Sequence, residues 1–119
     1  LVKFEKMTSC FDEITVLCVC YNSKNIIIEG LSSLMDAKKV IVVDNASTDG
    51  SVQAIEQALP SVTVIRSETN RGYGSGVNAG LEHVQTPYLL IVNPDAKISP
   101  DDVEKLYQSI LKYKNDTYL

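Results

Sequence analysis

The chain has 119 residues, which is the size of one small domain. Its hydrophobic share of 45% and charged share of 22% are ordinary for a globular protein and exclude intrinsic disorder as the main state. A formal net charge of −4 argues against binding to nucleic acids or anionic membranes, because both favour a basic surface.

Four apolar segments predict the strands of a sheet. Residues 14–20 form a continuous run of β-branched and other apolar side chains without a helical period. Such a run is typical of a strand that is buried on both faces of a parallel sheet. Further strands are predicted at residues 40–44, 62–66 and 88–92, and polar residues follow each of them.

An amphipathic helix is predicted after each strand. Asn22 or Ser23 is expected to cap the first helix, and Ser51 the second. Pro60 closes the second helix, and the third stops before Pro87. The residues at helical spacing that are expected to face the core are Ile27, Leu31, Leu34 and Met35, then Val52, Ile55 and Leu59, then Val77, Leu81 and Val84, and finally Val103, Leu106, Tyr107, Ile110 and Leu111.

The last helix has the clearest start. Ser99 stands at the predicted N-cap and Pro100 at the first helical position. Asp101 and Asp102 follow, where the positive end of the helix dipole favours negative charge. These signals place the beginning of this helix at residue 100.

The order βαβαβαβα with short connections predicts an α/β fold, doubly wound around a mainly parallel sheet, as in Rossmann-like nucleotide-binding domains. Ligands of such sheets bind outside the carboxyl ends of the strands. The polar clusters that follow the predicted strands are residues 21–22, 44–50, 70–74 and 93–95. A binding site is therefore expected at this edge of the sheet.

The three cysteines, Cys10, Cys18 and Cys20, make a poor disulfide framework. Cys18 and Cys20 lie two residues apart on a predicted strand, so they point to the same face and are poorly aimed for a bridge. A zinc site would need further ligands at suitable spacing, and the only histidine is His83. Buried free thiols in a reducing compartment are expected, with the cytoplasm as the location.

Two carboxylates stand at the ends of predicted strands. Asp44 fits either an acceptor of hydrogen bonds from a base or a ribose, or an ordinary aspartate on the approach to a helix. Asp95 fits either a ligand of Mg²⁺ or Mn²⁺ that is shared with a diphosphate, or a turn residue. Together at one edge of the sheet, they indicate a metal–nucleotide site.

Residues 74–79 match the G-x-G-x-x-A variant of the dinucleotide fingerprint. That fingerprint follows a first strand directly, whereas several polar residues separate this one from the third predicted strand, so NAD binding is disfavoured. The glycines are expected instead to let the backbone pass close to a ligand or a neighbouring strand. Arg71 fits a phosphate contact or a solvated side chain, and His83 is expected to face solvent.

Four blocks of the chain carry a recognisable pattern. They are VLCVCYNS at residues 16–23, VVDNASTDGS at 42–51, NRGYGSGVNAG at 70–80 and YLLIVNPD at 88–95. Their order and spacing, over about residues 14–111, closely resemble family 2 glycosyltransferases. The resemblance implies a GT-A fold whose N-terminal half binds a nucleoside-diphosphate sugar.

The resemblance also implies roles for individual residues. Tyr21 and Asn22 would border the base and the ribose, and Asp44 would accept a hydrogen bond from a pyrimidine imide. The segment 93–95 stands where the family's Asp-x-Asp motif binds the donor diphosphate and a divalent metal, Mn²⁺ or Mg²⁺. The residues expected to bind the nucleotide sugar are Tyr21, Asn22, Asp44, Asn45, Asp49, Asn70, Gly72 and Asn93, with Asp95 as the metal ligand.

The sequence departs from the family in two respects. Asn93 replaces the first acid of the metal motif, so Asp95 is the single charged ligand candidate. This Asn-Pro-Asp form resembles the branch that includes rhamnosyltransferases, which hints at dTDP-rhamnose. The family's catalytic base lies in a C-terminal acceptor-binding half that these residues lack, so no catalytic residue is expected in this chain.

The expected organisation is an N-terminal lead-in at residues 1–13, a nucleotide-sugar-binding domain at 14–113 and a C-terminal tail at 114–119. The expected function is donor binding within an inverting glycosyltransferase of polysaccharide biosynthesis. Its partners would be a dTDP- or UDP-sugar and a glycan or lipid-linked acceptor. The alternative is a non-catalytic nucleotide-binding or interaction module on the same fold.

Three further expectations follow from the missing acceptor half. The chain alone should not transfer sugar, because it lacks the base. Its sheet should keep an uncovered edge, which favours self-association. The whole protein is expected in the cytoplasm, at the inner face of the membrane if the missing regions attach it there.

Overall fold

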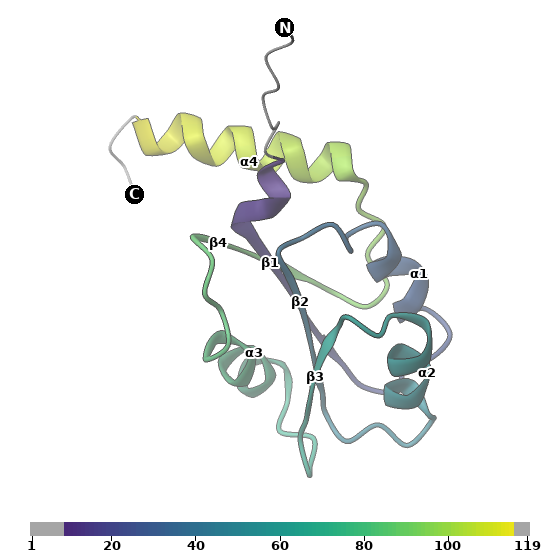
Figure 1. Cartoon of the computed structure of the whole chain (residues 1–119). Helices are drawn as coiled ribbons and strands as arrows, with labels where there is room; N and C mark the ends of the chain where they lie inside the picture. The colour runs from purple at the N-terminus through teal and green to yellow at the C-terminus, as the bar shows by residue number, and fades with distance from the viewer. Residues whose placement is uncertain (1–8, 116–119) are drawn as a thin grey trace, which may run out of the picture.

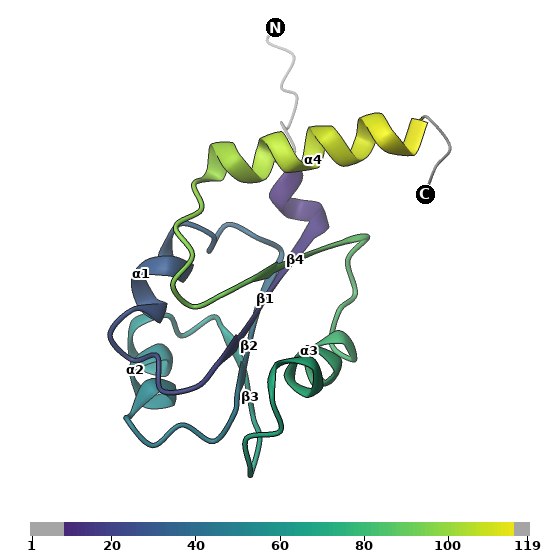
Figure 2. The same cartoon turned by 180° about the vertical axis from the view of Figure 1, so that it is seen from behind.

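The computed structural model describes residues 9–115 and contains a four-stranded parallel sheet in the order β3-β2-β1-β4 (Figure 1). The elements are the 3-10 helix η1 (Cys10–Glu13), β1 (Ile14–Cys20), α1 (Ile27–Ser32), β2 (Lys39–Asp44), α2 (Ser51–Ala58), β3 (Thr63–Arg66), α3 (Tyr73–Leu81), β4 (Tyr88–Val92) and α4 (Pro100–Asn115). Helices α1 and α2 cover one face of the sheet and α3 covers the other (Figure 1, Figure 2). The predicted doubly wound α/β fold is confirmed.

Strand β1 lies at the centre of the sheet, between β2 and β4, and all seven of its residues are buried. Its parallel register places Cys20 opposite Asp44 of β2, and Cys18 opposite Val92 of β4. A strand that is paired on both edges and covered on both faces has no solvated side, which explains its unbroken apolar sequence.

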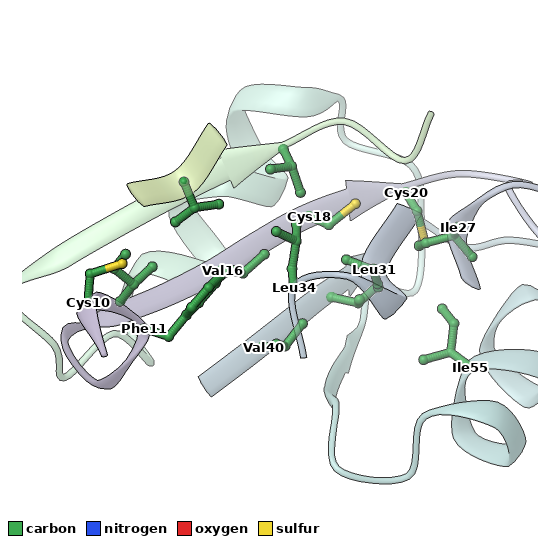
Figure 3. Close-up of a cluster of buried hydrophobic side chains, with 14 residues drawn as sticks. Cys10, Phe11, Val16, Cys18, Cys20, Ile27, Leu31, Leu34, Val40 and Ile55 are labelled. Atoms are coloured by element: carbon green, nitrogen blue, oxygen red, sulfur yellow. The ribbon is translucent and has the colours of Figure 1, made fainter. Parts of the chain in front are cut away.

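Alternate residues of β1 enter two separate cores. Val16, Cys18 and Cys20 face the larger core, on the side of α1 and α2 (Figure 3). Leu17 and Val19 face the smaller core, on the side of α3. The buried side chains that complete the larger core are Cys10, Phe11, Ile14, Ile27, Leu31, Leu34, Val40, Val42, Ile55, Val92 and Val103.

Helix α3 lies against β1 through two glycines. A Cβ atom added to Gly76 would lie 2.6 Å from Cγ1 of Val19, and one added to Gly80 would lie 2.9 Å from Cδ2 of Leu17. Both distances are too short for real carbon atoms, so α3 can approach the sheet this closely only because these positions lack side chains. The prediction that the glycines serve close approach to a strand is confirmed at these two positions.

Two helices are shorter than their apolar spacing predicts. Helix α1 ends at Ser32, and Leu34 lies in a turn in which its N–H donates to the Leu31 carbonyl at 2.9 Å. Helix α3 ends at Leu81, and Val84 again follows in a turn. Leu34 is still buried in the larger core, because a turn can deliver an apolar side chain to the same face as a helix.

The predicted caps of α1 and α2 are wrong. Ile26 is the N-cap of α1 and makes no side-chain cap, because the Asn22 side chain bonds to the loop after β2 instead. The Ser23 side chain donates back to the Tyr21 carbonyl. In α2, Ser51 is the first helical residue and the N-cap before it is a glycine with left-handed backbone.

Helix α4 begins as predicted. The Ser99 N–H donates to Asp102 Oδ2 at 3.0 Å, and the Asp102 N–H donates to Ser99 Oγ at 3.1 Å, which forms a reciprocal cap in front of Pro100. The helix continues through Asn115 and so includes the first residues of the predicted tail. The remaining tail residues 116–119, and residues 1–8 of the predicted lead-in, lie outside the described part of the chain.

Apolar side chains are exposed along β4 and α4. Within residues 9–115, β4 pairs only with β1, so its other edge is free. Ile91 of β4 and Leu106, Ile110 and Tyr113 of α4 are exposed, and the C-terminal half of α4 extends beyond β4 (Figure 1, Figure 2). Among these residues, no helix has both the length and the apolar character that a membrane crossing requires.

Candidate functional site

The strand order locates the candidate site. The chain adds β2 and then β3 on one side of β1, and it returns to the other side of β1 to form β4. Ligands of open α/β sheets bind at the carboxyl ends of the strands, where this reversal opens a crevice between neighbouring loops. The loops after β1 and β4 flank that point, and every predicted site residue lies in a loop at the carboxyl edge or at the end of a strand leading into one.

Asp44, the last residue of β2, is buried and holds the loop that follows it. Its Oδ1 accepts hydrogen bonds from the Cys20 thiol at 3.2 Å and the Ser47 hydroxyl at 2.5 Å. Its Oδ2 accepts one from the Ser47 N–H at 2.9 Å. Because a carboxylate oxygen can accept two hydrogen bonds, Oδ2 keeps capacity for one more donor.

The loops after β1 and β2 are joined by hydrogen bonds. Asn22 has left-handed backbone (φ 48°), and its Oδ1 accepts from the Thr48 N–H at 2.8 Å. Asp49 Oδ2 accepts from the Lys24 N–H at 3.2 Å, and its Oδ1 accepts from Ser51. The hydrogen bond from Ser51 is the main reason why the pKa of Asp49 is lowered. Asn22 and Asp49 therefore brace this corner of the site.

A second set of contacts ties the loop after β2 to the start of α3. The Asn45 side chain is buried and donates from Nδ2 to the Gly72 carbonyl at 3.1 Å. The Asn70 Oδ1 accepts from the Gly72 N–H at 2.9 Å, and Gly72 has a left-handed φ of 87°. Asn45, Asn70 and Gly72 thus fix the geometry of the third block.

The other predicted residues are exposed and free to meet a ligand. Tyr21, at the end of β1, has 51% of its surface exposed. Asn93 and Asp95 follow β4, and both are exposed. The predicted set therefore divides into six residues that hold the loops and three that face outward. Arg71 and His83 are exposed as well.

Asp95 is the candidate metal ligand. Its carboxylate accepts no hydrogen bond from any described residue, and it lines a pocket of about 190 Å³ together with Glu29 and Gly30 of α1. Within residues 9–115, no cluster of three or more His, Cys, Asp or Glu side chains could hold a metal ion. Asp95 therefore fits an ion such as Mg²⁺ or Mn²⁺ that takes most of its ligands from a diphosphate and water.

A larger pocket of about 370 Å³ lies elsewhere, between η1 and α4. It is lined by Asp12, Glu13 and Glu104 among others, and it lies near the start of β1 rather than at the carboxyl edge. None of the four sequence blocks contributes to it. The carboxyl edge therefore remains the better candidate.

Three residues that sequence reasoning missed support the site. Ser47 and Cys20 both donate to Asp44, and Gly30 of α1 lies directly against the segment that carries Asp95. Ser47 could have been found from the Asp-x-x-Ser spacing, which favours a side-chain turn. Burial raises the pKa of the Cys20 thiol, and its hydrogen bond to Asp44 raises that pKa further.

Comparison with known families gives a match along most of the chain. Residues 15–119 match the family model described as "Glycosyl transferase family 2". An uncharacterized glycosyltransferase of Mycobacterium bovis is 30% identical over 101 residues, which cover 85% of this chain and 45% of that protein. An N-acetylglucosaminyl-diphospho-decaprenol L-rhamnosyltransferase of Mycobacterium tuberculosis is 26% identical over 117 residues, covering 86% of this chain and 38% of that protein. The chain thus spans less than half the length of these relatives.

Solved structures agree with this result. S. aureus TarS (residues 1–349) in complex with UDP superposes with a TM-score of 0.72 and 28% identity, over 84% of this chain and 32% of that one. Glucosyl-3-phosphoglycerate synthase from Mycobacterium tuberculosis, in complex with Mn²⁺, UDP and glucosyl-3-phosphoglycerate, has a TM-score of 0.69 and 18% identity, over 84% and 40%. At this lower identity, the second likeness shows the shared fold alone.

Proposed function

Because the chain belongs to glycosyl transferase family 2, we propose that it is the donor-binding part of an inverting glycosyltransferase, and that it binds a nucleoside-diphosphate sugar together with a divalent metal ion. The observation that carries this proposal is the convergence of the four sequence blocks at one edge of the sheet. There, the exposed Tyr21 follows β1, the buried Asp44 ends β2 and the exposed Asp95 follows β4, and these three strands are neighbours in the sheet.

Each of these three side chains suits one part of the donor. Tyr21 offers an aromatic face on which a base can stack. Asp44 Oδ2 has one free acceptor position, which suits the N–H of a pyrimidine imide. Asp95 suits the diphosphate end, where it would hold Mn²⁺ or Mg²⁺. Such an ion, when bound, neutralises the charge that develops on the departing diphosphate.

We place the transfer chemistry itself in the complete protein. In an inverting displacement, a base removes the proton of the acceptor hydroxyl, whose oxygen attacks the anomeric carbon as the bond to the diphosphate breaks. The carboxylates of this site are engaged in loop contacts or suited to metal. We therefore expect no transfer to a glycan or lipid-linked acceptor when the chain is incubated alone with radiolabelled dTDP-rhamnose or UDP-sugars. Acceptor-dependent turnover above the protein-free control would refute this.

We propose that the base of the donor is a pyrimidine, so that the nucleotide is dTDP or UDP. We also propose that the complete protein acts in polysaccharide biosynthesis. The UDP bound in the S. aureus TarS structure supports a pyrimidine base, and the relative named as a rhamnosyltransferase supports a role in glycan synthesis. The buried free thiols Cys10, Cys18 and Cys20 favour a reducing compartment, so we propose the cytoplasm as the location. A non-catalytic nucleotide-binding module on the same fold is the alternative, and it would bind nucleotide in the complete protein without turnover.

Calorimetry tests which nucleotide the chain binds and whether binding depends on a metal ion. UDP, dTDP, GDP and ADP are titrated into the chain in Mn²⁺ and, separately, in EDTA. We expect the pyrimidine nucleotides to bind more tightly than the purine nucleotides, and Mn²⁺ to strengthen binding in the wild type but not in Asp95→Asn. Equal or tighter binding of GDP or ADP would refute base recognition by Asp44. An affinity for UDP that does not change on chelation would refute the metal role of Asp95.

Variants separate base recognition from loop support. Asp44→Ala should weaken UDP binding by about 1.5–3 kcal/mol if the carboxylate makes a charge-assisted hydrogen bond to the base. Because Asp44 also holds Ser47, Ser47→Ala serves as a second variant that loosens the turn and keeps the carboxylate. The exposed Asp36 lies outside the site, so Asp36→Asn is the control for the loss of one negative charge, matched to Asp95→Asn. A loss in Ser47→Ala as large as that in Asp44→Ala would mean that Asp44 acts only on the loop.

The free edge of β4 suits the proposed self-association of this chain. It carries the exposed Ile91 in a strand without charged residues, and Leu106 and Ile110 of α4 line a pocket with Tyr88, Leu89 and Leu90 of the same strand. Unprotected edges of this kind favour pairing with another strand. Sedimentation velocity at increasing concentration should show dimers, and Ile91→Lys should remove them. A wild-type chain that stays monomeric throughout would refute the proposal.

A further inference from the structure

The segment that carries Asp95 lies directly against α1 at a glycine. A Cβ atom added to Gly30 would lie 2.9 Å from the Pro94 carbonyl oxygen and 3.1 Å from the Ala96 carbonyl oxygen. Both neighbours are backbone atoms, which cannot rotate out of the way as a side chain can. The two carbonyls flank Asp95 in the sequence, so this contact supports the backbone on both sides of that residue.

A second contact holds the same segment to α1. The Ser33 hydroxyl, just after the helix, donates to the Ile98 carbonyl at 2.8 Å. Within the segment, the Ala96 N–H donates to the Asn93 carbonyl at 3.0 Å and closes a turn around Asp95. The turn is therefore fixed internally, and it rests on α1 at Gly30 and at Ser33.

Gly30 weakens α1, and its close contact with the segment that carries Asp95 offsets this loss of helix stability. A glycine inside a helix destabilises it by roughly 0.5–1 kcal/mol relative to alanine. Helix α1 is only six residues long and contains Gly30 in its interior. The φ of Gly30 lies outside the left-handed region, so backbone conformation does not demand a glycine. The close approach of the Pro94 and Ala96 carbonyls is the remaining reason for it.

Asp95 depends on this support more than the other two carboxylates of the site do. Asp44 and Asp49 are held by hydrogen bonds to their carboxylates, whereas no described residue donates to the Asp95 carboxylate. No side-chain hydrogen bond therefore fixes this carboxylate, and the turn of backbone that carries it sets its position. We propose that Gly30 is a positioning residue that sets where the Asp95 carboxylate meets the metal and the diphosphate, an inference that rests on the proposed function.

The expected displacement is large on the scale of metal coordination. Ordinary van der Waals contact begins at 3.4 Å, whereas a Cβ added at residue 30 would lie 2.9 Å from the Pro94 carbonyl oxygen, so α1 and this segment must separate by roughly 0.5 Å. Metal–ligand distances tolerate about 0.2 Å. Substitutions in residues that support a metal ligand typically lower metal affinity about 10- to 100-fold.

The test compares UDP affinity with and without metal in Gly30→Ala. The quantity measured is the metal gain, defined as the dissociation constant of UDP in EDTA divided by that in Mn²⁺. We expect Gly30→Ala to lower the metal gain about 10-fold and to leave the dissociation constant in EDTA within about twofold of wild type. The residues proposed to contact the base, Tyr21 and Asp44, lie outside α1, so binding in EDTA should not change.

Gly80→Ala is the matched control. It also adds a methyl group to a close helix contact, but against Leu17 on the opposite face of the sheet. It should lower stability and keep the metal gain of the wild type. If Gly30→Ala does not fold, Ser33→Ala removes the second contact instead, and we expect a smaller fall in the metal gain, about threefold, because one hydrogen bond is lost.

The outcomes separate this inference from the proposed function. A wild-type chain without any metal gain would overturn the metal site, and the role of Gly30 with it. A wild-type metal gain that persists in Gly30→Ala would overturn the positioning role alone. An equal loss of affinity in EDTA and in Mn²⁺ would mean general damage to the site, and it would also overturn the positioning role.

Discussion

The three glycines of α3 give a stability series within one helix. Gly76 and Gly80 face Val19 and Leu17 of β1, whereas a Cβ added to Gly74 would find no atom within 4 Å. Replacing each glycine by alanine therefore makes the same chemical change in different surroundings. We expect Gly76→Ala and Gly80→Ala to destabilise the protein, and Gly74→Ala to stabilise it.

The magnitudes follow from two opposing effects. Alanine favours a helix over glycine by roughly 0.5–1 kcal/mol, and this gain applies at all three positions. Overpacking a filled core costs typically 1–3 kcal/mol, and it applies only where the new methyl group overlaps Val19 or Leu17. The net loss should be about 0.5–2 kcal/mol. Gly76→Ala should lie at the upper end, because the β-branched Val19 cannot readily rotate away.

Urea denaturation followed by far-ultraviolet circular dichroism measures these differences. The slope of the transition should stay constant across the series, so that shifts in the midpoint report stability. Unchanged or increased stability in both Gly76→Ala and Gly80→Ala would refute the packing argument. A loss in Gly74→Ala equal to theirs would refute it as well, since no atom lies near that position.

Two further predictions concern ionisable groups. Burial raises the pKa of Cys10 to about 11 and that of Cys18 to about 12, and it raises the pKa of Cys20 as well. Iodoacetamide at pH 8 should therefore leave all three thiols unlabelled in the native protein and label them in urea, as mass spectrometry can count; native labelling would contradict their burial. The Ser51 hydrogen bond lowers the pKa of Asp49, so its contribution to stability is present above the unfolded pKa of about 3.9 and is lost as the pH falls through the lower folded value. The melting temperature should thus fall more steeply below about pH 4 in wild type than in Asp49→Asn, and parallel curves would refute this link.

The strands could be predicted closely from the sequence, because burial on two faces leaves a local signal. Residues 14–20 and 88–92 form β1 and β4 with the predicted bounds. The helices were less predictable at their ends. After α1, Leu34 keeps the helical spacing although it lies in a turn, since spacing reports the buried face and not the backbone hydrogen bonds.

The location of the candidate site could be predicted from the sequence. The sequence did not show which of its residues hold the loops and which face outward toward a ligand. The predicted residues all lie at the carboxyl edge, as parallel strands require. Which of them hold the loops depends on contacts between segments about 25 residues apart, such as Asn22 with Thr48. No local pattern reports such a contact. The supporting role of Gly30 is hidden for the same reason, because its neighbours lie in the loop after β4.

The hydrogen bonds between the loops after β1 and β2 also bear on the entropy of ligand binding. The Asn22 side chain and backbone, the Lys24 N–H and the Ser23 N–H all bond to the segment of residues 47–51. Fixing the backbone of one residue costs about 1–2 kcal/mol of conformational entropy. Because these loops become ordered when the protein folds, this loss of entropy does not occur again when a ligand binds. A ligand arriving at this corner encounters a preorganised surface, so more of its contact energy is expressed as affinity.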